Sequence, residues 1–456
     1  MNEDVKEAIR SNPTIRKETF DIAWPSVVES VLVALAGMVD TYMVAGLGKA
    51  SVAAIGVTNQ PKYFVFTVFF ATNVAISSLI ARRVGEKKRT EAHGVFLTGL
   101  CFVAGLAIAL SVICVAIANP FMRLCGANAE TAALSVKYFR IIMGCSIFQV
   151  MSLYINAAQR GSGNTRIAMT TNLVSNLVNV ILNYLLIQGH FGFPALGVIG
   201  AAIATVAGTV VAFVMSVRSI FLEKSFIQVQ LIRTEQIRPE QKYMKELAPV
   251  AGTFLGENIL TRLGMMVTGA MTARVGTAPY AAHLVGMNFM NIGFAFGDGL
   301  QAAAIALVGR SIGENDYEKA KKYAWTEQRF GLIISLVISA LMLVFHRNIF
   351  NAYYPNDPEM LGYGDIISYF FAVIMPIQVS KIIFNGTLRA AGDIRYTLIG
   401  STIGVTVVQP IILWICMFGL KNGLTGVWFS ILVSQAIQLL LFGGRFISGE
   451  WQNKKL

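Results

Sequence analysis

The chain has 456 residues, of which 55% are hydrophobic and 14% are charged, and its formal net charge is +12. A water-soluble domain carries about 25% charged residues, so this composition excludes an ordinary soluble globular protein and indicates an integral membrane protein. The positive charge would also suit a nucleic-acid-binding protein, but its distribution along the chain, described below, excludes that class.

Apolar stretches of about 20 residues, the length that crosses a bilayer as a helix, occur along the whole chain. In chain order they lie near residues 19–45, 55–81, 92–118, 131–158, 167–188, 196–221, 244–272, 280–308, 324–346, 363–388, 396–417 and 424–446. No alternation of apolar and polar residues typical of a transmembrane barrel is present. The sequence therefore predicts an all-α polytopic membrane protein with twelve transmembrane helices.

The two halves of the chain resemble each other. Three pairs of motifs recur at nearly the same offset, the first at 310 − 82 = 228. The pairs are residues 82–86 (RRVGE) with 310–314 (RSIGE), 160–166 (RGSGNTR) with 389–395 (RAAGDIR), and 197–200 (GVIG) with 423–426 (GLTG). Half-length repeats in an apolar chain are typical of transporters, because two pseudo-symmetric helix bundles can move about a central site. We predict two lobes, residues 1–221 and 243–456, joined by a polar linker at 222–242.

The cations gather in alternate loops. Lysines and arginines precede the first span, follow the second, fourth, eighth and tenth spans, and surround the linker, whereas the other loops hold few, among them Lys62. The positive-inside rule then places both termini and the linker in the cytoplasm. The stretch from Met1 to Arg16 has no apolar core before a cleavage site, so we expect no signal peptide. We expect a multi-pass protein of the cytoplasmic membrane.

Two carboxylates lie inside the first span. A charge at mid-bilayer costs about 2.5 to 3.5 kcal/mol, so each one needs a partner or a function. Glu29 and Asp40 are eleven residues apart, about 16 Å along one face of a helix.

The fifth span carries a stripe of amides on one helical face, formed by Asn172, Asn176, Asn179 and Asn183. One interpretation is that these amides hold neighbouring helices together. The other is that Asn179 and Asn183 face Asp40 and form a cavity in which its carboxyl binds and releases a proton.

The second half has its own intramembrane charges, Glu257, Asp298 and Lys381. They indicate either a cation or substrate site, or a structural ion pair of Lys381 with one of the two acids. Met287 and Met290 are candidates for an apolar substrate cavity, although methionines at helical spacing are more often packing or lipid-facing residues.

Motifs for catalysis are missing. The histidines are isolated, and no HExxH, GxSxG or GxxxxGK[ST] sequence is present, so we expect neither an enzyme nor an ATP-driven pump. The five cysteines lack metal-ligand spacing. We expect no cofactor and no resident metal.

These motifs together resemble the multidrug and toxic compound extrusion (MATE) transporters over essentially the whole chain. The resemblance is carried by Pro25 with Asp40, by Gly85-Glu86 and Gly313-Glu314, and by residues 160–166, 197–205, 388–393 and 423–428. It implies two six-helix lobes around a V-shaped cleft, and export of organic cations and other amphiphiles in exchange for protons or sodium ions.

The resemblance also implies roles for particular residues. Asp40 matches the first-helix acid of the family and Asn179 its fifth-helix asparagine, whereas Asn183 stands where many members carry a second aspartate. Glu257 matches the glutamate of a second-lobe cation site, and Gln378 stands where those members often have an aspartate. Each site thus has one carboxylate fewer than in those members, which argues against sodium, and a coupling sodium ion would have only the regions near Asp40 and Glu257 to bind.

We thus expect a cation-coupled antiporter with Asp40, Asn179 and Asn183 as the ion-coupling group. Glu257, Asp298, Gln378 and Lys381 would form a second-lobe site, and Glu29, Asn172, Asn176, Met287 and Met290 would line the substrate cavity. The expected partners are a small amphiphilic or cationic substrate and membrane lipid, with no nucleic acid, and we expect a monomer. One alternative is a flippase for a lipid-linked or saccharide substrate, against which the intramembrane acids argue, and a remote one is a membrane-embedded enzyme.

Overall fold

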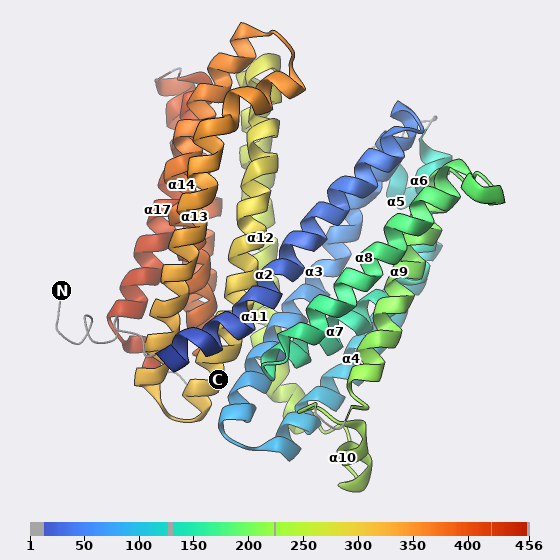
Figure 1. Cartoon of the computed structure of the whole chain (residues 1–456), viewed down its shortest axis with the longest axis vertical. Coiled ribbons are helices and arrows are strands. Elements are labelled where there is room, and N and C mark those ends of the chain that lie inside the picture. The colour runs from blue at the N-terminus through green and yellow to red at the C-terminus, as the bar shows by residue number, and fades with distance from the viewer. Residues whose placement is uncertain (1–12, 126–130, 223–224, 421, 454–456) are drawn as a thin grey trace. The chain divides into compact units, whose positions relative to one another are not determined.

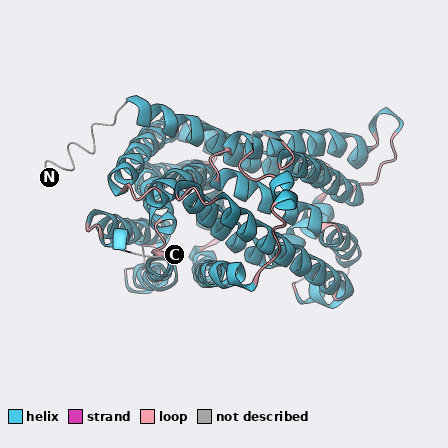
Figure 2. Cartoon of the chain, turned by 90° about the horizontal axis from the view of Figure 1, so that it is seen from below, coloured by secondary structure: helices cyan, strands magenta, loops and turns pink. Residues whose placement is uncertain are grey.

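The computed structural model describes residues 13–125, 131–222, 225–420 and 422–453, and every regular element in these ranges is a helix (Figure 1, Figure 2). Most of the stretch from Met1 to Arg16, in which no signal peptide is expected, lies outside them. The all-α class predicted from the sequence is confirmed.

In the first half of the chain the α-helices are α2 (Pro13–Ala45), α3 (Lys49–Gly85), α4 (Arg89–Ala116), α5 (Ala118–Leu124), α6 (Ala132–Gly144), α7 (Ser146–Gly161), α8 (Thr165–Gln188), α9 (Val198–Ser219) and α10 (Val229–Thr234). In the second half they are α11 (Gln241–Thr272), α12 (Thr277–Gly313), α13 (Tyr317–Tyr353), α14 (Pro358–Ala390), α15 (Ile394–Ser401), α16 (Gln409–Trp414) and α17 (Gly423–Ile447). Two π-helical segments, η3 (Thr402–Val408) and η4 (Ile415–Gly419), continue α15 and α16. Short 3₁₀ turns are η1 (His190–Gly192), η2 (Ala273–Val275) and η5 (Glu450–Asn453).

The predicted spans coincide with these helices. In the described ranges ten helical stretches are long and apolar enough to cross a membrane, or eleven when α6 and α7, which meet at a bend of 46°, count as one span. The remaining predicted span is α11, which is less apolar because Glu257 and Arg262 lie in its middle. The structure therefore agrees with the twelve-helix architecture expected from the sequence.

Residue contacts divide the chain into two compact units, and the division falls inside two helices. The first-half unit is Val28–Ala251, and the second-half unit consists of the residues up to Val27 together with those from Gly252 onward. The first turns of α2 thus pack in the second-half unit, and the first turns of α11 pack in the first-half unit. Pro25 and Pro249, both inside helices, precede the two change-over points by three residues each, 28 − 25 and 252 − 249. The lobe boundaries drawn at 1–221, 222–242 and 243–456 stay a prediction.

A glutamate anchors each of these exchanged helix starts. The hydroxyl of Tyr323 in α13 donates a hydrogen bond to Glu18 of α2. In the other unit, Arg83 at the end of α3 binds Glu246 of α11 at 2.8 Å. The two glutamates are 246 − 18 = 228 residues apart, so both halves place an acid at the same point of the repeat.

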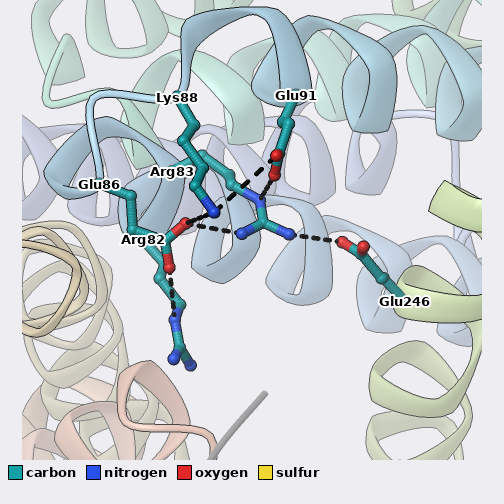
Figure 3. Close-up of polar contacts among 6 residues, drawn as sticks. All are labelled: Arg82, Arg83, Glu86, Lys88, Glu91 and Glu246. Atoms are coloured by element: carbon teal, nitrogen blue, oxygen red, sulfur yellow. Dashed lines mark hydrogen bonds and ion pairs between the residues drawn. The ribbon is translucent and has the colours of Figure 1, made fainter.

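The Arg83 contact belongs to a cluster of charged side chains at the α3–α4 turn (Figure 3). Arg83 contacts Glu86 at 2.6 Å and Glu91 at 3.3 Å as well as Glu246, and Lys88 lies 3.5 Å from Glu86. Burial raises the pKa of Glu86, but the hydrogen bond and positive charge of Arg83 and the other cations outweigh it, so the pKa lies below its ordinary value. The ion pairs of this cluster are therefore strongest when Glu86 is ionised.

This cluster predicts acid sensitivity. Because the folded-state pKa of Glu86 is lower than the unfolded one, its stabilisation is complete above pH 4.5, the ordinary value, and is lost as the pH falls through the folded pKa. We expect Glu86→Gln to lower the unfolding temperature at pH 7 and to reduce the further drop between pH 5 and pH 3 relative to wild type. Thermal unfolding in detergent measures this, with the exposed Glu240→Gln as control. An equal pH dependence of wild type and Glu86→Gln would contradict the assignment.

The core of the second-half unit forms between α12, α14 and α17. Trp428, Phe371 and Met375 are at most 1% exposed, and Trp428 fills the space beside Gly286. A Cβ atom at Gly286 would lie 2.5 Å from the Trp428 ring, so only glycine allows α12 to approach α17 this closely. Close approach through small residues is how helices associate in a membrane, where van der Waals packing replaces the hydrophobic effect.

Candidate functional site

The carboxylate of Asp40 is held by the amides of α8. The side-chain nitrogen of Asn183 donates to Asp40 Oδ1 at 2.7 Å. The nitrogen of Asn179 also donates to Oδ1 at 2.7 Å, in the amide orientation that satisfies both ends of its side chain, and the oxygen then faces the Thr205 hydroxyl at 3.3 Å. Asn179 and Asn183 are both buried, while Asp40 is half-buried. The structure therefore brings together the three residues predicted to couple ions.

Local sequence explains how this group assembles. Asn179 and Asn183 are four residues apart, so one face of α8 presents both amides. The α9 helix supplies Thr205 and comes close to α8 because Gly208 has no side chain. A Cβ atom at Gly208 would lie 2.9 Å from the Ser175 carbonyl oxygen and 3.2 Å from Asn179 Cβ.

A lysine accompanies this acid. Lys62 of α3 interacts electrostatically with Asp40, and it is half-buried nine residues inside the span Ala53–Gly85. Counting Lys62 among the loop cations was therefore wrong. The signal that could have found it is its position seven residues inside the predicted span 55–81, where a lysine requires a partner.

Glu29 forms an ion pair in the same unit. It accepts from Arg160 Nη1 at 2.8 Å, at the end of α7, and from the amide of Asn172 at 2.7 Å. Asn176 lies on α8 between Asn172 and Asn179, and its buried amide nitrogen has no hydrogen-bond partner among the described residues. Glu29 is 8% exposed, so it is a paired and buried group.

The second half repeats this arrangement. Glu257, 4% exposed, accepts from Arg389 Nη2 at 2.8 Å and from the Ser401 hydroxyl at 2.6 Å. The offsets from the first half are 257 − 29 = 228, 389 − 160 = 229 and 401 − 172 = 229. Each unit therefore builds the same bridge from its first long helix to two later helices, which are α7 and α8 in the first half and α14 and α15 in the second.

This bridge answers one of the two alternatives for the second-half charges, a structural ion pair of Lys381 with Glu257 or Asp298. The Lys381 Nζ donates instead to Gln438 at 2.9 Å and reaches both acids only through longer-range electrostatic interaction. Arg389, at the end of α14, pairs with Glu257 instead, because its guanidinium offers several hydrogen-bond donors in a fixed plane. Sequence reasoning had assigned Arg160 and Arg389 to loops, although both share the repeat offset of the two glutamates.

The two other second-half candidates, Asp298 and Gln378, have different surroundings. Asp298 is exposed and interacts electrostatically with Arg389 and Lys381. Gln378 is fully buried on α14, and neither of its amide atoms has a hydrogen-bond partner among the described residues. The structure does not join Gln378 to Glu257 by a hydrogen bond.

The two methionines lie in a hydrophobic core. Met290 is 1% exposed and belongs to the buried cluster of the second-half unit, and Met287 packs against that cluster. In this structure both are packing residues, because neighbouring apolar side chains cover them. Their place in a substrate cavity stays a prediction that this arrangement does not favour.

The Asp40 group has no counterpart in the repeat. Position 40 + 228 is Thr268, whose hydroxyl bonds to the Gly264 carbonyl of its own helix at 3.0 Å, and position 183 + 229 is Ile412. The glutamate bridge is thus common to both halves, while the Asp40 group belongs to the first half. Across the described residues, no three His, Cys, Asp or Glu side chains gather as in a metal centre.

A family model described as MatE matches the chain twice, over residues 25–185 and over residues 254–415. The chain belongs to the MatE family. Each match covers most of one half, so the internal repeat and the family assignment support each other. The protein is accordingly a multi-pass membrane transporter of the MATE family, as the motifs predicted.

Individual relatives agree with this assignment. The chain is 22% identical to "Uncharacterized transporter YisQ" of Bacillus subtilis, over 99% of each chain, and 25% identical to "Probable multidrug resistance protein NorM" of Thermotoga maritima, over 97% of this chain and 94% of the relative. Among solved structures, an outward-facing multidrug resistance MATE family transporter of the MOP superfamily superposes with a TM-score of 0.88, at 20% identity and 98% coverage of both chains. That likeness shows the shared fold.

The glutamate bridges predict a stability test. Removing one partner leaves a buried charge unpaired, which costs about 3 to 5 kcal/mol. We expect Glu257→Gln to lower the unfolding midpoint strongly and Glu257→Gln with Arg389→Gln to recover part of the loss, and the same for Glu29→Gln and Arg160→Gln. Unfolding of the purified protein in detergent by heat or denaturant measures each cycle.

The result separates a structural from an ion-binding Glu257. If Glu257→Gln left stability unchanged while abolishing transport, the structural bridge would be refuted and a cation site favoured. Loss of stability in both halves of the repeat, with recovery in both double variants, supports the bridge.

Proposed function

We propose that the protein is a secondary antiporter that exports small amphiphilic solutes, organic cations and drugs among them, across the cytoplasmic membrane in exchange for protons. The observation that carries the proposal is the intramembrane carboxyl of Asp40, held by two amides and close to Lys62. Membership of the MATE family and a relative named as a multidrug resistance protein support it. The proposed topology has both termini in the cytoplasm, and the proposed working unit is a monomer without cofactor.

The donors around Asp40 favour a proton over a sodium ion. Both amide nitrogens donate to Oδ1, which leaves Oδ2 as the oxygen that takes the proton without breaking either hydrogen bond. A sodium ion would need several oxygen ligands, and the second aspartate of many family members is Asn183 here. The positive charge of Lys62 further disfavours a metal cation beside Asp40.

Lys62 also gives the coupling a physical basis. With Asp40 ionised, the two charges balance, and the site is neutral. When a proton arrives, Lys62 loses its counter-charge, so the local charge becomes positive and repels a bound organic cation. Proton binding and cation binding therefore oppose each other, which is the requirement for exchange.

The energy available depends on stoichiometry. Exchange of one monovalent cation for one proton moves no net charge and is driven by the pH difference, about 1.4 kcal/mol per unit. A second proton would add the membrane potential, about 2.3 kcal/mol per 100 mV.

Asp40→Asn removes the titratable group and keeps the shape and the hydrogen-bonding capacity of the side chain. We expect it to reduce export of a cationic dye from an efflux-deficient host to the level of cells without the transporter, at normal expression. Asp21→Asn, an exposed acid on the same helix, is the matched control and should export normally. Normal export by Asp40→Asn would remove Asp40 from the mechanism.

An ion-swap experiment tests the coupling ion. Purified protein in liposomes preloaded with the dye is exposed to a pH gradient without sodium, and separately to a sodium gradient at equal pH. We expect release with the pH gradient alone, and none in Asp40→Asn liposomes. Release driven by sodium alone would refute proton coupling while leaving antiport intact.

A further inference from the structure

A cleft opens where α8 begins and α9 ends. It has a volume of about 420 Å³ and lies inside the first-half unit. Its lining residues are Arg166, Ile167, Thr170, Thr171, Met215, Arg218, Ser219 and Leu222. None of these described residues is acidic, and Ile167, Met215 and Leu222 give it an apolar wall.

Two arginines lie at the ends of candidate membrane spans, where the phosphates of membrane lipids are expected. Arg166 is the second residue of the span Thr165–Gln188, and Arg218 is the second-last residue of the span Val198–Ser219. Both side chains are exposed, and no ion pair to either is found in the described residues. The two arginines therefore line one cleft at the ends of two helices, α8 and α9, that pack against each other.

In the second half, side chains of the protein itself contact the arginine at the position that corresponds to Arg218. Arg445, near the end of α17, is the nearest counterpart of Arg218: the offset 445 − 218 = 227 differs by one residue from the offset 423 − 197 = 226 of the motifs that open α9 and α17. Its guanidinium binds Asp393 at 2.7 Å and also contacts Glu450, and it lies 4.9 Å from the centre of the Tyr396 ring. Two carboxylates and one aromatic ring thus cover this arginine.

The first half lacks the corresponding groups. Asn164 stands at the position of Asp393 and Ile167 at that of Tyr396, both at an offset of 229. The amide carries no charge, and the smaller side chain of Ile167 lines the cleft instead of a ring. Arg445 is therefore neutralised by carboxylates of the second half, whereas its counterpart Arg218 lines a partly apolar cleft in the first half.

We propose that this cleft is a binding site for an anionic glycerophospholipid. Arg166 and Arg218 bind the phosphate of the headgroup, and the apolar wall receives the upper part of an acyl chain. Arginine suits this role because its planar guanidinium donates two hydrogen bonds to one phosphate. Basic pockets between membrane helices bind acidic lipid headgroups in this manner.

Native mass spectrometry of the purified full-length protein tests the site. The protein is titrated in detergent with dioleoylphosphatidylglycerol or with dioleoylphosphatidylcholine. We expect the protein to bind dioleoylphosphatidylglycerol more tightly than dioleoylphosphatidylcholine. The affinity for dioleoylphosphatidylglycerol should fall about fivefold for each arginine removed, hence about 25-fold for Arg166→Gln with Arg218→Gln. Arg233→Gln removes the same charge from the exposed helix α10 and should leave the preference unchanged.

A further double variant introduces the side chains of the second half. Asn164→Asp with Ile167→Tyr supplies a carboxylate and an aromatic ring that can contact Arg218 in place of the lipid phosphate. We therefore expect this variant to bind phosphatidylglycerol more weakly, although both arginines remain. The measurement is independent of transport, so its outcome does not depend on the proposed antiport. Variants with unchanged unfolding temperatures are compared, which separates loss of the site from loss of the fold.

Several outcomes would overturn the proposal. These are equal binding of the two lipids by wild type, an unchanged lipid preference in the double arginine variant, and displacement of the lipid by inorganic phosphate at the same concentration. The last result would mean that a free anion alone satisfies the site and that the apolar wall contributes nothing.

Discussion

The buried bridge between a glutamate and an arginine is the interaction on which each half of this transporter depends. A glutamate in the middle of a membrane helix is costly unless a cation meets it, and Glu29 and Glu257 each meet an arginine at 2.8 Å. Because the partner lies at the end of a different helix, the pair fixes how those helices align. A second contact, from Asn172 or Ser401, binds the next helix to the same acid. Two copies of one motif thus set the architecture of both units.

The candidates for function lie where the two halves differ. Asp40 has a threonine as its counterpart, so the acid that we propose to carry protons occurs once. The same holds for the proposed lipid cleft, since Asn164 replaces the carboxylate that neutralises Arg445 in the second half. A repeated scaffold keeps its structural pairs in both copies, and single substitutions on that scaffold create sites without disturbing it. Internal comparison therefore identifies sites that composition alone does not.

Several predictions from sequence needed the structure to complete or correct them. The sequence predicted that Glu29 and Asp40 share one face of the first span and that the asparagines share one face of the fifth, and the structure joins these two faces by hydrogen bonds. The role of Lys62 was missed because the lysine was counted among the loop cations, although it lies seven residues inside the predicted span 55–81. Met290 was a cavity candidate, but neighbouring helices bury it, which no single helix pattern reveals.

The sequence by itself determined the all-α membrane class, the positions of the helices and the internal repeat, because these depend on local hydrophobicity and on recurrence along one chain. It also supplied the family, since the motifs that carry the resemblance are linear. Only the tertiary structure decided which charges meet. Ion pairs such as Glu257 with Arg389 join residues 132 positions apart, and their partners depend on how helices pack in three dimensions. The division of the chain inside α2 and α11 is likewise a property of packing, because a continuous helix gives no local sign of the unit to which each end belongs.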